Sequence, residues 1–431
     1  MNWKFKKYKG SLNGEIIVPP DKSISHRAIM FGSICEGTLN IKNFLFSEDC
    51  LSSVFAFREM GVKIEIKNNN EIIVFGKGLK GLQKPKKNLY LGNSGTSMRI
   101  IPGILIGQDF DSIFTGDTSL SKRPMDRIVD PLTLMGADIK YLEKKPYAPF
   151  QIKGKRDINS INYNMPIPSA QVKSCIIAAA LYAKGITCVK EPFLCRDHTE
   201  RMLKYFLADI EKKDLETRIT SKNKLIAKDL FVPGDISSAA FFIVGGLVIK
   251  GSCIILRNVG LNPTRIGIIN VLKRMGANIN ILDIKDNVEP MGDLEVKYSE
   301  LKGTIIEENE IPFLIDEIPI LSVAALFSKG TTIIKGIKEL KVKETNRVKS
   351  IMDNFLKLGV NIEEIDNNII IEGCCKKLDI LEFDSYQDHR IAMSMAILSH
   401  LTENGALIKN VKCVDTSYPG FFKDLESIKN N

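Results

Sequence analysis

One pattern recurs six times along this chain: a short cluster of polar and cationic residues precedes a strongly apolar stretch of helical length. The six clusters occupy residues 21–27, 92–99, 169–174, 234–238, 316–319 and 388–390. Most of the apolar stretches end at a glycine that leads into a β-branched strand. Because these stretches carry few polar residues on any face, we expect helices that are buried on all sides.

A second, amphipathic helix and another strand follow in most units, with a glycine at the helix end, as in Met60-Gly61 and Met135-Gly136. The whole unit recurs every ~70 residues, which is longer than the repeats of common solenoids. Six units in two sets of three predict an α/β fold of two similar domains.

The sixth unit is cut short, whereas the N-terminal segment 8–18 has strand character without a preceding helix. We therefore expect the N-terminal strands to complete the last unit, so that the chain crosses between the domains twice, near residues 19–20 and 232–235. This predicts an N-terminal domain of residues 20–234 and a C-terminal domain of residues 1–19 plus 235–431. The double crossover would form a hinge beside a ligand cleft, with rigid docking of the domains as the alternative.

Size and composition narrow the class of protein. The length of 431 residues favours two or three domains, and 44% hydrophobic with 26% charged residues is typical of globular proteins. No apolar run is long enough to span a bilayer, and the first residues lack a secretory signal, so we expect a cytoplasmic protein without membrane contact. The nine cysteines lack disulfide or metal spacing, and we expect reduced, mostly buried thiols. The net charge of +9 is dispersed and no nucleic-acid-binding motif is present, so we expect a lysine-rich solvated surface that can also steer small anions, and no nucleic-acid partner.

The polar clusters have the composition of anion sites. A helix N-terminus offers unpaired N–H groups and the positive end of the helix dipole. The donors that the clusters and the turn at 121–125 add are Lys22, Ser23, Arg27, Gly95, Arg123, Ser169 and Gln171. Each has an ordinary structural alternative, since Ser23 and Ser169 can cap their helices and the cations can be solvated. Their recurrence at equivalent places predicts a pocket for a multiply charged anion.

Two carboxylates stand among cations in the C-terminal half. Asp316 precedes the fifth apolar stretch, and Glu344 lies between Lys343 and Arg347, while Arg390 follows in the sixth cluster. Such a pair suits proton transfer, in which one carboxylate accepts and the other donates, and salt bridges are the structural alternative. The four histidines lack metal-ligand spacing, so we expect no metal.

Seven ordered segments resemble the motifs of the 5-enolpyruvylshikimate-3-phosphate (EPSP) synthase family. They are residues 20–27, 91–96, 122–125, 169–174, 233–240, 343–347 and 388–390. The resemblance covers almost the whole chain. It implies the enolpyruvyl transferase fold, in which two domains of three βαβαββ units each form an inverse α/β barrel-like arrangement and close over the substrates. It also implies a monomer without a cofactor.

The activity that the resemblance implies is transfer of the enolpyruvyl group of phosphoenolpyruvate to the 5-hydroxyl of shikimate 3-phosphate, with release of phosphate on the way to chorismate. The residues implied for shikimate 3-phosphate are Lys22, Ser23, Arg27, Ser169, Gln171, Asp316 and Lys343. The residues implied for phosphoenolpyruvate are Lys22, Gly95, Arg123, Gln171, Arg347 and Arg390. The implied catalytic residues are Asp316 as the base, Glu344 as the proton donor, and Lys22.

Some positions depart from the commonest pattern of the family. Thr416 stands where many members carry a lysine that contacts phosphoenolpyruvate, so that role is not carried over. Asp21, Ser94 and Ser97 also differ from frequent choices. These departures leave the implied reaction in place but leave sensitivity to the inhibitor glyphosate open.

Two other functions compete with this interpretation. The sister enolpyruvyl transferase that acts on UDP-N-acetylglucosamine typically has Lys-Asn in place of Lys22-Ser23 and uses a loop cysteine as an acid. No cysteine lies between Cys50 and Cys175, where that loop would fall. The other alternative is a non-catalytic polyanion-binding protein, for which Asp316 and Glu344 would have no chemical role.

Overall fold

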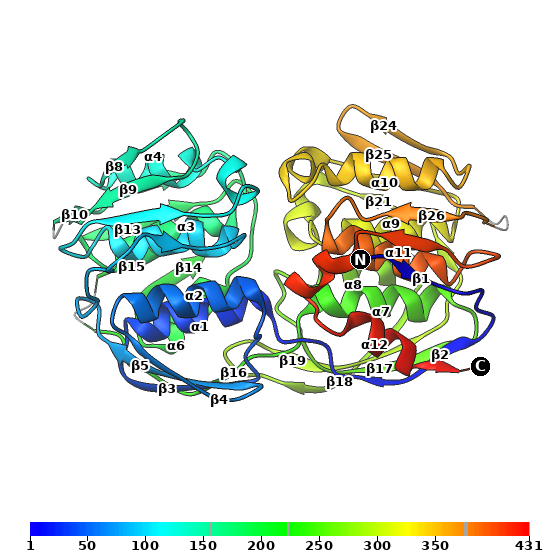
Figure 1. Cartoon of the computed structure of the whole chain (residues 1–431), viewed down its shortest axis with the longest axis horizontal. Coiled ribbons are helices and arrows are strands. Elements are labelled where there is room, and N and C mark those ends of the chain that lie inside the picture. The colour runs from blue at the N-terminus through cyan, green and yellow to red at the C-terminus, as the bar shows by residue number, and fades with distance from the viewer. Residues whose placement is uncertain (155–156, 222–223, 375–377, 431) are drawn as a thin grey trace. The chain divides into compact units, whose positions relative to one another are not determined.

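The computed structural model describes residues 1–154, 157–221, 224–374 and 378–430. The chain divides into two compact units: the N unit, Pro20–Val232, and the C unit, Met1–Pro19 together with Pro233–Asn431. Figure 1 shows the elements of both units coloured along the chain. The predicted domains, residues 20–234 and residues 1–19 plus 235–431, stay predictions.

The N unit contains three four-stranded sheets built to one plan. In each sheet the first two strands of the spatial order are parallel and the others are antiparallel. The first sheet consists of β16 (Leu230–Phe231), β3 (Glu36–Lys42), β5 (Glu71–Lys77) and β4 (Lys63–Asn68). The second consists of β6 (Leu89–Tyr90), β7 (Ser112–Thr115), β9 (Phe150–Lys153) and β8 (Asp138–Tyr141). The third consists of β11 (Asn162–Asn164), β13 (Ile186–Lys190), β15 (Glu216–Thr220) and β14 (Asp209–Lys213), and a short parallel pair joins β10 (Ile158–Asn159) to β12 (Ala183–Lys184).

Two sets of helices accompany the sheets of the N unit. The largely buried helices are α1 (Lys22–Ser33), α3 (Gly95–Leu105) and α5 (Ala170–Ala180). The amphipathic helices are α2 (Glu48–Glu59), α4 (Asp126–Leu134) and α6 (His198–Tyr205), and a short 3-10 turn, η1 (Leu120–Lys122), precedes α4. One hydrophobic cluster joins these helices to the inner faces of the sheets.

The C unit repeats this plan with the N-terminal strands added. Its five-stranded sheet has the order β18 (Asn278–Lys285), β19 (Met291–Lys297), β17 (Cys253–Gly260), β2 (Ser11–Ile16) and β28 (Lys429–Asn430). Its four-stranded sheet has the order β21 (Ile305–Ile306), β23 (Thr331–Ile334), β25 (Asn368–Glu372) and β24 (Ile362–Ile365). The third sheet has the order β1 (Trp3–Lys4), β27 (Leu407–Lys409) and β26 (Glu382–Asp384), and β20 (Leu301–Lys302) pairs with β22 (Ser328–Lys329).

The two N-terminal strands divide between two of these sheets. β1 pairs antiparallel with β27 in the last unit of the repeat, so the dark blue N-terminus lies among red elements in Figure 1. β2 instead pairs in parallel with β17, which belongs to the fourth unit, and antiparallel with β28 at the C-terminus. The N-terminal segment therefore pairs with strands from the beginning of the C unit's second segment (β17) and from its end (β27 and β28).

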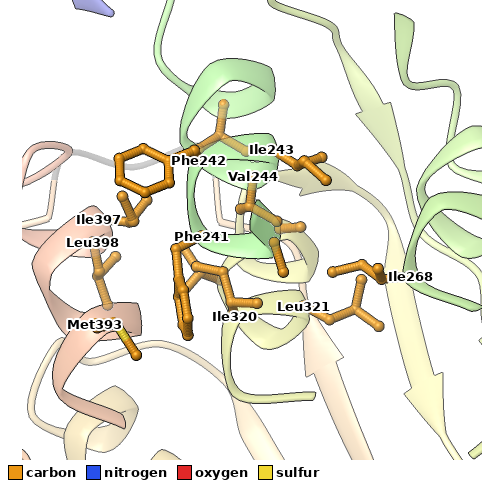
Figure 2. Close-up of a cluster of buried hydrophobic side chains, with 14 of the residues drawn as sticks. Phe241, Phe242, Ile243, Val244, Ile268, Ile320, Leu321, Met393, Ile397 and Leu398 are labelled. Carbon is orange, nitrogen blue, oxygen red and sulfur yellow. The ribbon is translucent and has the colours of Figure 1, made fainter. Parts of the chain in front are cut away.

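Three helices of the C unit confirm the expectation of burial on all sides. Every residue of α7 (Ile236–Val248), α9 (Ile318–Leu326) and α11 (His389–Ser399) is buried. Figure 2 shows Phe241 of α7 packed among Ile320 of α9 and Met393 and Leu398 of α11. The remaining helices are α8 (Gly267–Arg274), α10 (Arg347–Leu356), α12 (Phe421–Ser427) and the 3-10 turns η2 (Glu308–Phe313), η3 (Ile337–Val342) and η4 (Val411–Thr416).

The glycines expected at the ends of the amphipathic helices have left-handed backbone conformations. The φ angles of Gly61, Gly136 and Gly276 are 81°, 96° and 97°. Each follows a methionine that forms the C-cap of its helix. Glycine adopts this conformation without steric cost, which explains why the sequence places it where the chain turns from helix to strand.

Two expectations from the composition concern the cysteines and the apolar helices. The eight described cysteines are free, but only four of them are buried, so the expectation of mostly buried thiols holds for half of them; Cys375 lies outside the described residues. Among the helices of the described residues, none combines the length and the apolar character needed to cross a membrane.

Candidate functional site

In the N unit, hydrogen bonds between side chains join the N-termini of α1, α3 and α5. Each helix begins with a side-chain cap: Asp21 accepts from the backbone N–H of Ile24, Ser94 from that of Ser97, and Ser169 from that of Val172. For Ser169, the structural alternative of a helix cap is present in the structure. Ser23 does not cap α1, because the helix already begins at Lys22 and Asp21 occupies the N-cap position.

Arg27 connects the first of these helices to the other elements. Its side chain is buried, and its Nε donates to Thr199 Oγ1 over 2.8 Å, while Nη2 donates to Ser174 Oγ over 2.9 Å. Nη1 donates to the backbone oxygen of Ser23 over 3.0 Å. Residues of α5 and α6 therefore fix the direction of the Arg27 side chain, which the sequence alone did not predict.

Lys22 lies in an ion pair at the same helix N-terminus. Its Nζ is 3.0 Å from Oδ2 of Asp49 on α2, and both side chains are mostly buried. A fully solvated lysine, the structural alternative for this position, is therefore not what the structure contains.

Gln171 joins α5 to the N-terminus of α3. Its Oε1 accepts from Arg99 Nη1 over 2.6 Å, and its Nε2 donates to Thr96 Oγ1 over 3.3 Å. Both the oxygen and the nitrogen of its amide therefore have partners on α3, which fixes the orientation of the Gln171 side chain.

Arg123 lies beside the backbone of Gly95. Its Nη2 donates to Asn93 Oδ1 over 2.5 Å, and Asn93 in turn donates to Asp117 over 2.8 Å. A Cβ on Gly95 would stand 3.1 Å from Arg123 Nη1, so the glycine permits the guanidinium to approach the start of α3. The N unit thus brings Lys22, Ser23, Arg27, Gly95, Arg123, Ser169 and Gln171 to a linked set of helix N-termini.

In the C unit, Arg347 is the centre of a carboxylate cluster. It begins α10 with a side chain that is 1% exposed, and each of its nitrogens faces a different acid. Nε donates to Asp388 over 2.8 Å, Nη2 to Glu344 over 2.7 Å, and Nη1 to Asp316 over 3.3 Å. Burial alone would lower the pKa of Arg347, but the three carboxylates, Asp388 the strongest, raise it overall, so the guanidinium stays charged.

Two further cations surround Asp316. Lys343 Nζ is 3.7 Å from Asp316 Oδ1, and Arg390 Nη2 is 3.9 Å from Asp316 Oδ2. Arg390 Nη1 also donates to the backbone oxygen of Asp316 over 3.2 Å. The predicted residues Asp316, Lys343, Glu344, Arg347 and Arg390 therefore form one network in the C unit.

Several residues of both networks were not assigned a role from the sequence. Thr199 and Arg99 orient Arg27 and Gln171, and Arg265 contacts the start of α7. Thr199 and Arg265 offer no sequence signal, because their partners lie 172 and 30 residues away. Thr416 lies on η4 and donates its hydroxyl to the backbone oxygen of Cys413 over 2.7 Å, so it supplies no cation.

A buried ion cluster surrounds Lys173 near the N-terminus of α5. Lys173 is fully buried, and its Nζ is 2.6 Å from both Glu191 Oε1 and Glu200 Oε1. Lys212 Nζ is 3.0 Å from Glu191 Oε2, and the Cys195 thiol donates to Glu191. Burial would lower the pKa of Lys173, but Glu200 and Glu191 raise it overall, so the amine stays charged.

Replacing Lys173 with methionine is expected to destabilise the protein by about 3–5 kcal/mol, because it leaves two buried carboxylates without their main counter-ion. Urea unfolding with an unchanged m-value measures this loss. Lys204→Met, at an exposed position of α6, is the matched control and is expected to change stability little. Equal stability of the two variants would contradict the argument.

A second buried titratable group, His26, connects α1 to α2. Its Nδ1 lies 2.8 Å from Ser53 Oγ, and Ser53 lies 2.8 Å from Ser97 Oγ at the start of α3. Burial lowers the pKa of His26 to about 3, Asp49 opposes this shift, and the neighbouring cations Lys22 and Arg27 add to it. The folded protein therefore keeps this ring neutral over most of the acidic range.

Acid is expected to destabilise the protein through His26. The unfolded chain binds a proton below pH ~6.5 and the folded protein only near pH 3, so stability is full above the unfolded pKa and falls as the pH decreases. Between about pH 7 and pH 4.5 the His26 contribution amounts to about 2–3 kcal/mol. Urea unfolding at both pH values should show a smaller loss for His26→Gln than for the unchanged protein, and equal losses would contradict the assignment.

Comparison with known proteins gives consistent results over the whole chain. A family model described as EPSP synthase (3-phosphoshikimate 1-carboxyvinyltransferase) matches residues 6–425. A protein from Bacillus anthracis (strain A0248) named 3-phosphoshikimate 1-carboxyvinyltransferase is 47% identical over 418 residues, which cover 97% of each chain. A protein of the same name from Petrotoga mobilis is 48% identical over 422 residues, which cover 97% of this chain and 98% of that one. A solved EPSP synthase structure from Acinetobacter baumannii matches with a TM-score of 0.91 and 42% identity, covering 99% of this chain and 98% of that one. This structural similarity confirms the predicted fold class.

Proposed function

The chain belongs to the EPSP synthase family, and we propose that the two networks described above bind the substrates and carry out the chemistry of that family's reaction. The reaction transfers the enolpyruvyl group of phosphoenolpyruvate to the 5-hydroxyl of shikimate 3-phosphate and releases phosphate, within aromatic amino-acid biosynthesis. The family assignment supports this function over transfer to UDP-N-acetylglucosamine.

The observation that carries the proposal is the Arg347 network. Two carboxylates, Asp316 and Glu344, contact the same buried guanidinium, with Lys343 and Arg390 beside Asp316. A protein that only bound anions would gain nothing from carboxylates at this place, because they repel the ligand. Acid–base chemistry on an anionic substrate requires both kinds of group together.

We assign shikimate 3-phosphate to seven of the predicted residues. The set is Lys22, Ser23, Arg27, Ser169, Gln171, Asp316 and Lys343. Helix N-termini and the cations Lys22 and Arg27 suit its phosphate, while Asp316 can accept hydrogen bonds from ring hydroxyls. The orientation of Arg27 by Ser174 and Thr199 supports this role, because a fixed guanidinium loses less entropy when it binds an anion.

We assign phosphoenolpyruvate to a second, overlapping set. It consists of Lys22, Gly95, Arg123, Gln171, Arg347 and Arg390. The ligand carries a phosphate and a carboxylate, and planar guanidinium groups match both anions through paired hydrogen bonds. Gly95 lets the Arg123 guanidinium approach the N-terminus of α3, and a cation beside a helix N-terminus suits a phosphate oxygen.

The proposed chemistry moves two protons. Glu344 donates a proton to the methylene carbon C3 of phosphoenolpyruvate, which leaves C2 electron-poor. Asp316 takes the proton of the 5-hydroxyl as that oxygen forms a bond to C2, giving a tetrahedral adduct. Glu344 then takes a proton back from C3, which restores the double bond as the bond from C2 to phosphate breaks, and Asp316 passes the hydroxyl proton to the departing phosphate. Lys22 stabilises the negative charge on the phosphate during these steps.

The cations also decide when Asp316 can act. In the described residues its carboxylate lies within 3.3–3.9 Å of Arg347, Lys343 and Arg390, which favours the ionised form needed in a base. Binding of the anionic substrates offsets the charge of these cations, so that the carboxylate becomes more basic when the hydroxyl proton must be taken.

A phosphate-release assay tests the function. Phosphate should appear from phosphoenolpyruvate only when shikimate 3-phosphate is present, and UDP-N-acetylglucosamine should not replace it. Release that depends on the nucleotide sugar and ignores shikimate 3-phosphate would assign the chain to the sister reaction. We further propose that the enzyme acts in the cytoplasm as a monomer, and light scattering of the purified protein tests the second statement.

A further inference from the structure

Glu317 is a buried carboxylate at the start of α9, next to Asp316, and the function proposed above gives it no role. Its side chain is fully buried. Ser237 at the start of α7 donates its hydroxyl to Glu317 Oε1. The same oxygen lies 3.9 Å from Arg265 Nη2 and 4.0 Å from Arg390 Nη1 on α11. Glu317 is therefore the point at which the N-termini of α7, α9 and α11 are joined.

The partners of Glu317 are themselves fixed. Arg265 Nη2 donates to Ser237 Oγ over 2.8 Å and to Asp235 Oδ1 over 3.2 Å. Asp235 is the N-cap of α7, accepting from the backbone N–H of Ser237. These contacts hold the Glu317 carboxylate in one place, because a change in its position would break the hydrogen bond at the capped end of a fully buried helix.

Stability does not explain this carboxylate well. A buried charge is costly unless it is fully paired, and ion pairs of this kind can often be replaced by apolar side chains without loss of stability. Within the described residues, Glu317 Oε2 has no hydrogen-bond partner. A charge that is only partly compensated, yet placed 4.0 Å from a site cation, points to a role in the site.

We propose that Glu317 is a positioning residue that fixes the Arg390 guanidinium for phosphoenolpyruvate. Arg390 Nη1 donates to the backbone oxygen of Asp316, and the Glu317 carboxylate lies 4.0 Å from the same nitrogen, close enough to attract it electrostatically. Arg390 thus lies between two carboxylates at similar distances, 3.9 Å from Asp316 and 4.0 Å from Glu317, and Glu317 opposes a closer approach of the guanidinium to Asp316. The inference rests on the proposed assignment of Arg390 to phosphoenolpyruvate.

The test is Glu317→Gln, which keeps the shape and the acceptor for Ser237 but removes the charge. The KM for phosphoenolpyruvate is expected to rise about tenfold, the loss of one charge-assisted contact. The KM for shikimate 3-phosphate and the kcat should change little. A residue with only a structural role would lower the unfolding temperature and leave the ratio of the two KM values unchanged, and that result would overturn the proposal.

Two further variants sharpen the test. Glu317→Asp keeps the charge and is expected to fall between Glu317→Gln and the unchanged protein in its KM for phosphoenolpyruvate; a value as high as that of Glu317→Gln would contradict a role for the charge. Glu300→Gln removes an exposed carboxylate paired with Lys329 and should leave both KM values unchanged.

The outcomes remain distinguishable from those of the proposed function. If the protein without substitutions releases no phosphate with shikimate 3-phosphate, the proposed function is refuted. If that protein is active and Glu317→Gln has the same KM for phosphoenolpyruvate, only this inference is refuted. Should Glu317→Gln fail to fold, Ser237→Ala removes the hydrogen bond that holds Glu317. It should then raise the same KM, and an unchanged KM would count against the proposal.

Discussion

Replacing Asp316 with asparagine is expected to lower kcat by about 10²–10⁴-fold, the usual contribution of a positioned general base. Asparagine keeps the size of the side chain and an oxygen that can accept a hydrogen bond from a ring hydroxyl, but it cannot take a proton. Binding of shikimate 3-phosphate, measured by titration calorimetry, should remain close to that of the unchanged protein. The loss should therefore appear in turnover and not in affinity.

The same variant separates an enzyme from a protein that only binds polyanions. In the second case, removing a negative charge from the neighbourhood of Lys343, Arg347 and Arg390 would tighten anion binding and change nothing else. Glu300→Gln, an exposed acid in the same unit, controls for the loss of one negative charge. Turnover of Asp316→Asn equal to that of the control would contradict the role of Asp316 as the base.

The parts of the fold that the sequence predicted well are those with local causes. An apolar stretch without a polar face has only one way to avoid water, and α7, α9 and α11 are buried along their whole length. The glycines that end the amphipathic helices likewise report a local backbone requirement, which the positive φ of Gly61 and Gly136 satisfies. The capping residue of α1 was misjudged by two positions because Ser23 and Asp21 are both good caps.

The parts that the sequence did not predict depend on contacts between distant segments. β2 pairs with β17 across 240 residues, for example in the register that places Asn13 opposite Cys253, and strand pairing at such a distance leaves no local signal. The contacts that orient Arg27 are equally distant in sequence, because its partners Ser174 and Thr199 lie 147 and 172 residues away. Only the folding of the chain brings these three residues together. Motifs therefore identified the cations and acids, but not the residues that fix their directions.

Arg347→Lys is expected to lower kcat/KM for phosphoenolpyruvate about 10²-fold and the free energy of unfolding by about 3 kcal/mol, because lysine keeps the charge but loses the guanidinium fork. One ammonium group cannot contact Asp388, Glu344 and Asp316 at once, as the three nitrogens of Arg347 do. Asp388 is fully buried and also caps α11. When Asp388 loses its contact with Arg347, the N-terminus of α11, which carries Arg390, is therefore destabilised as well. Steady-state kinetics and urea unfolding measure the two effects.

The comparison with an exposed arginine shows whether geometry or charge is responsible. Arg274 contacts Glu310 through two nitrogens at a site that is 42% exposed, and Arg274→Lys should alter stability and activity little, because solvent already screens that pair. The pKa of Arg347 is raised by its carboxylates, so its protonation does not change in the working range and the loss in Arg347→Lys must come from lost hydrogen bonds. If both arginines tolerate lysine equally, the three-way bridge does not organise the site, and Asp316, Glu344 and Asp388 must be positioned by their own helices.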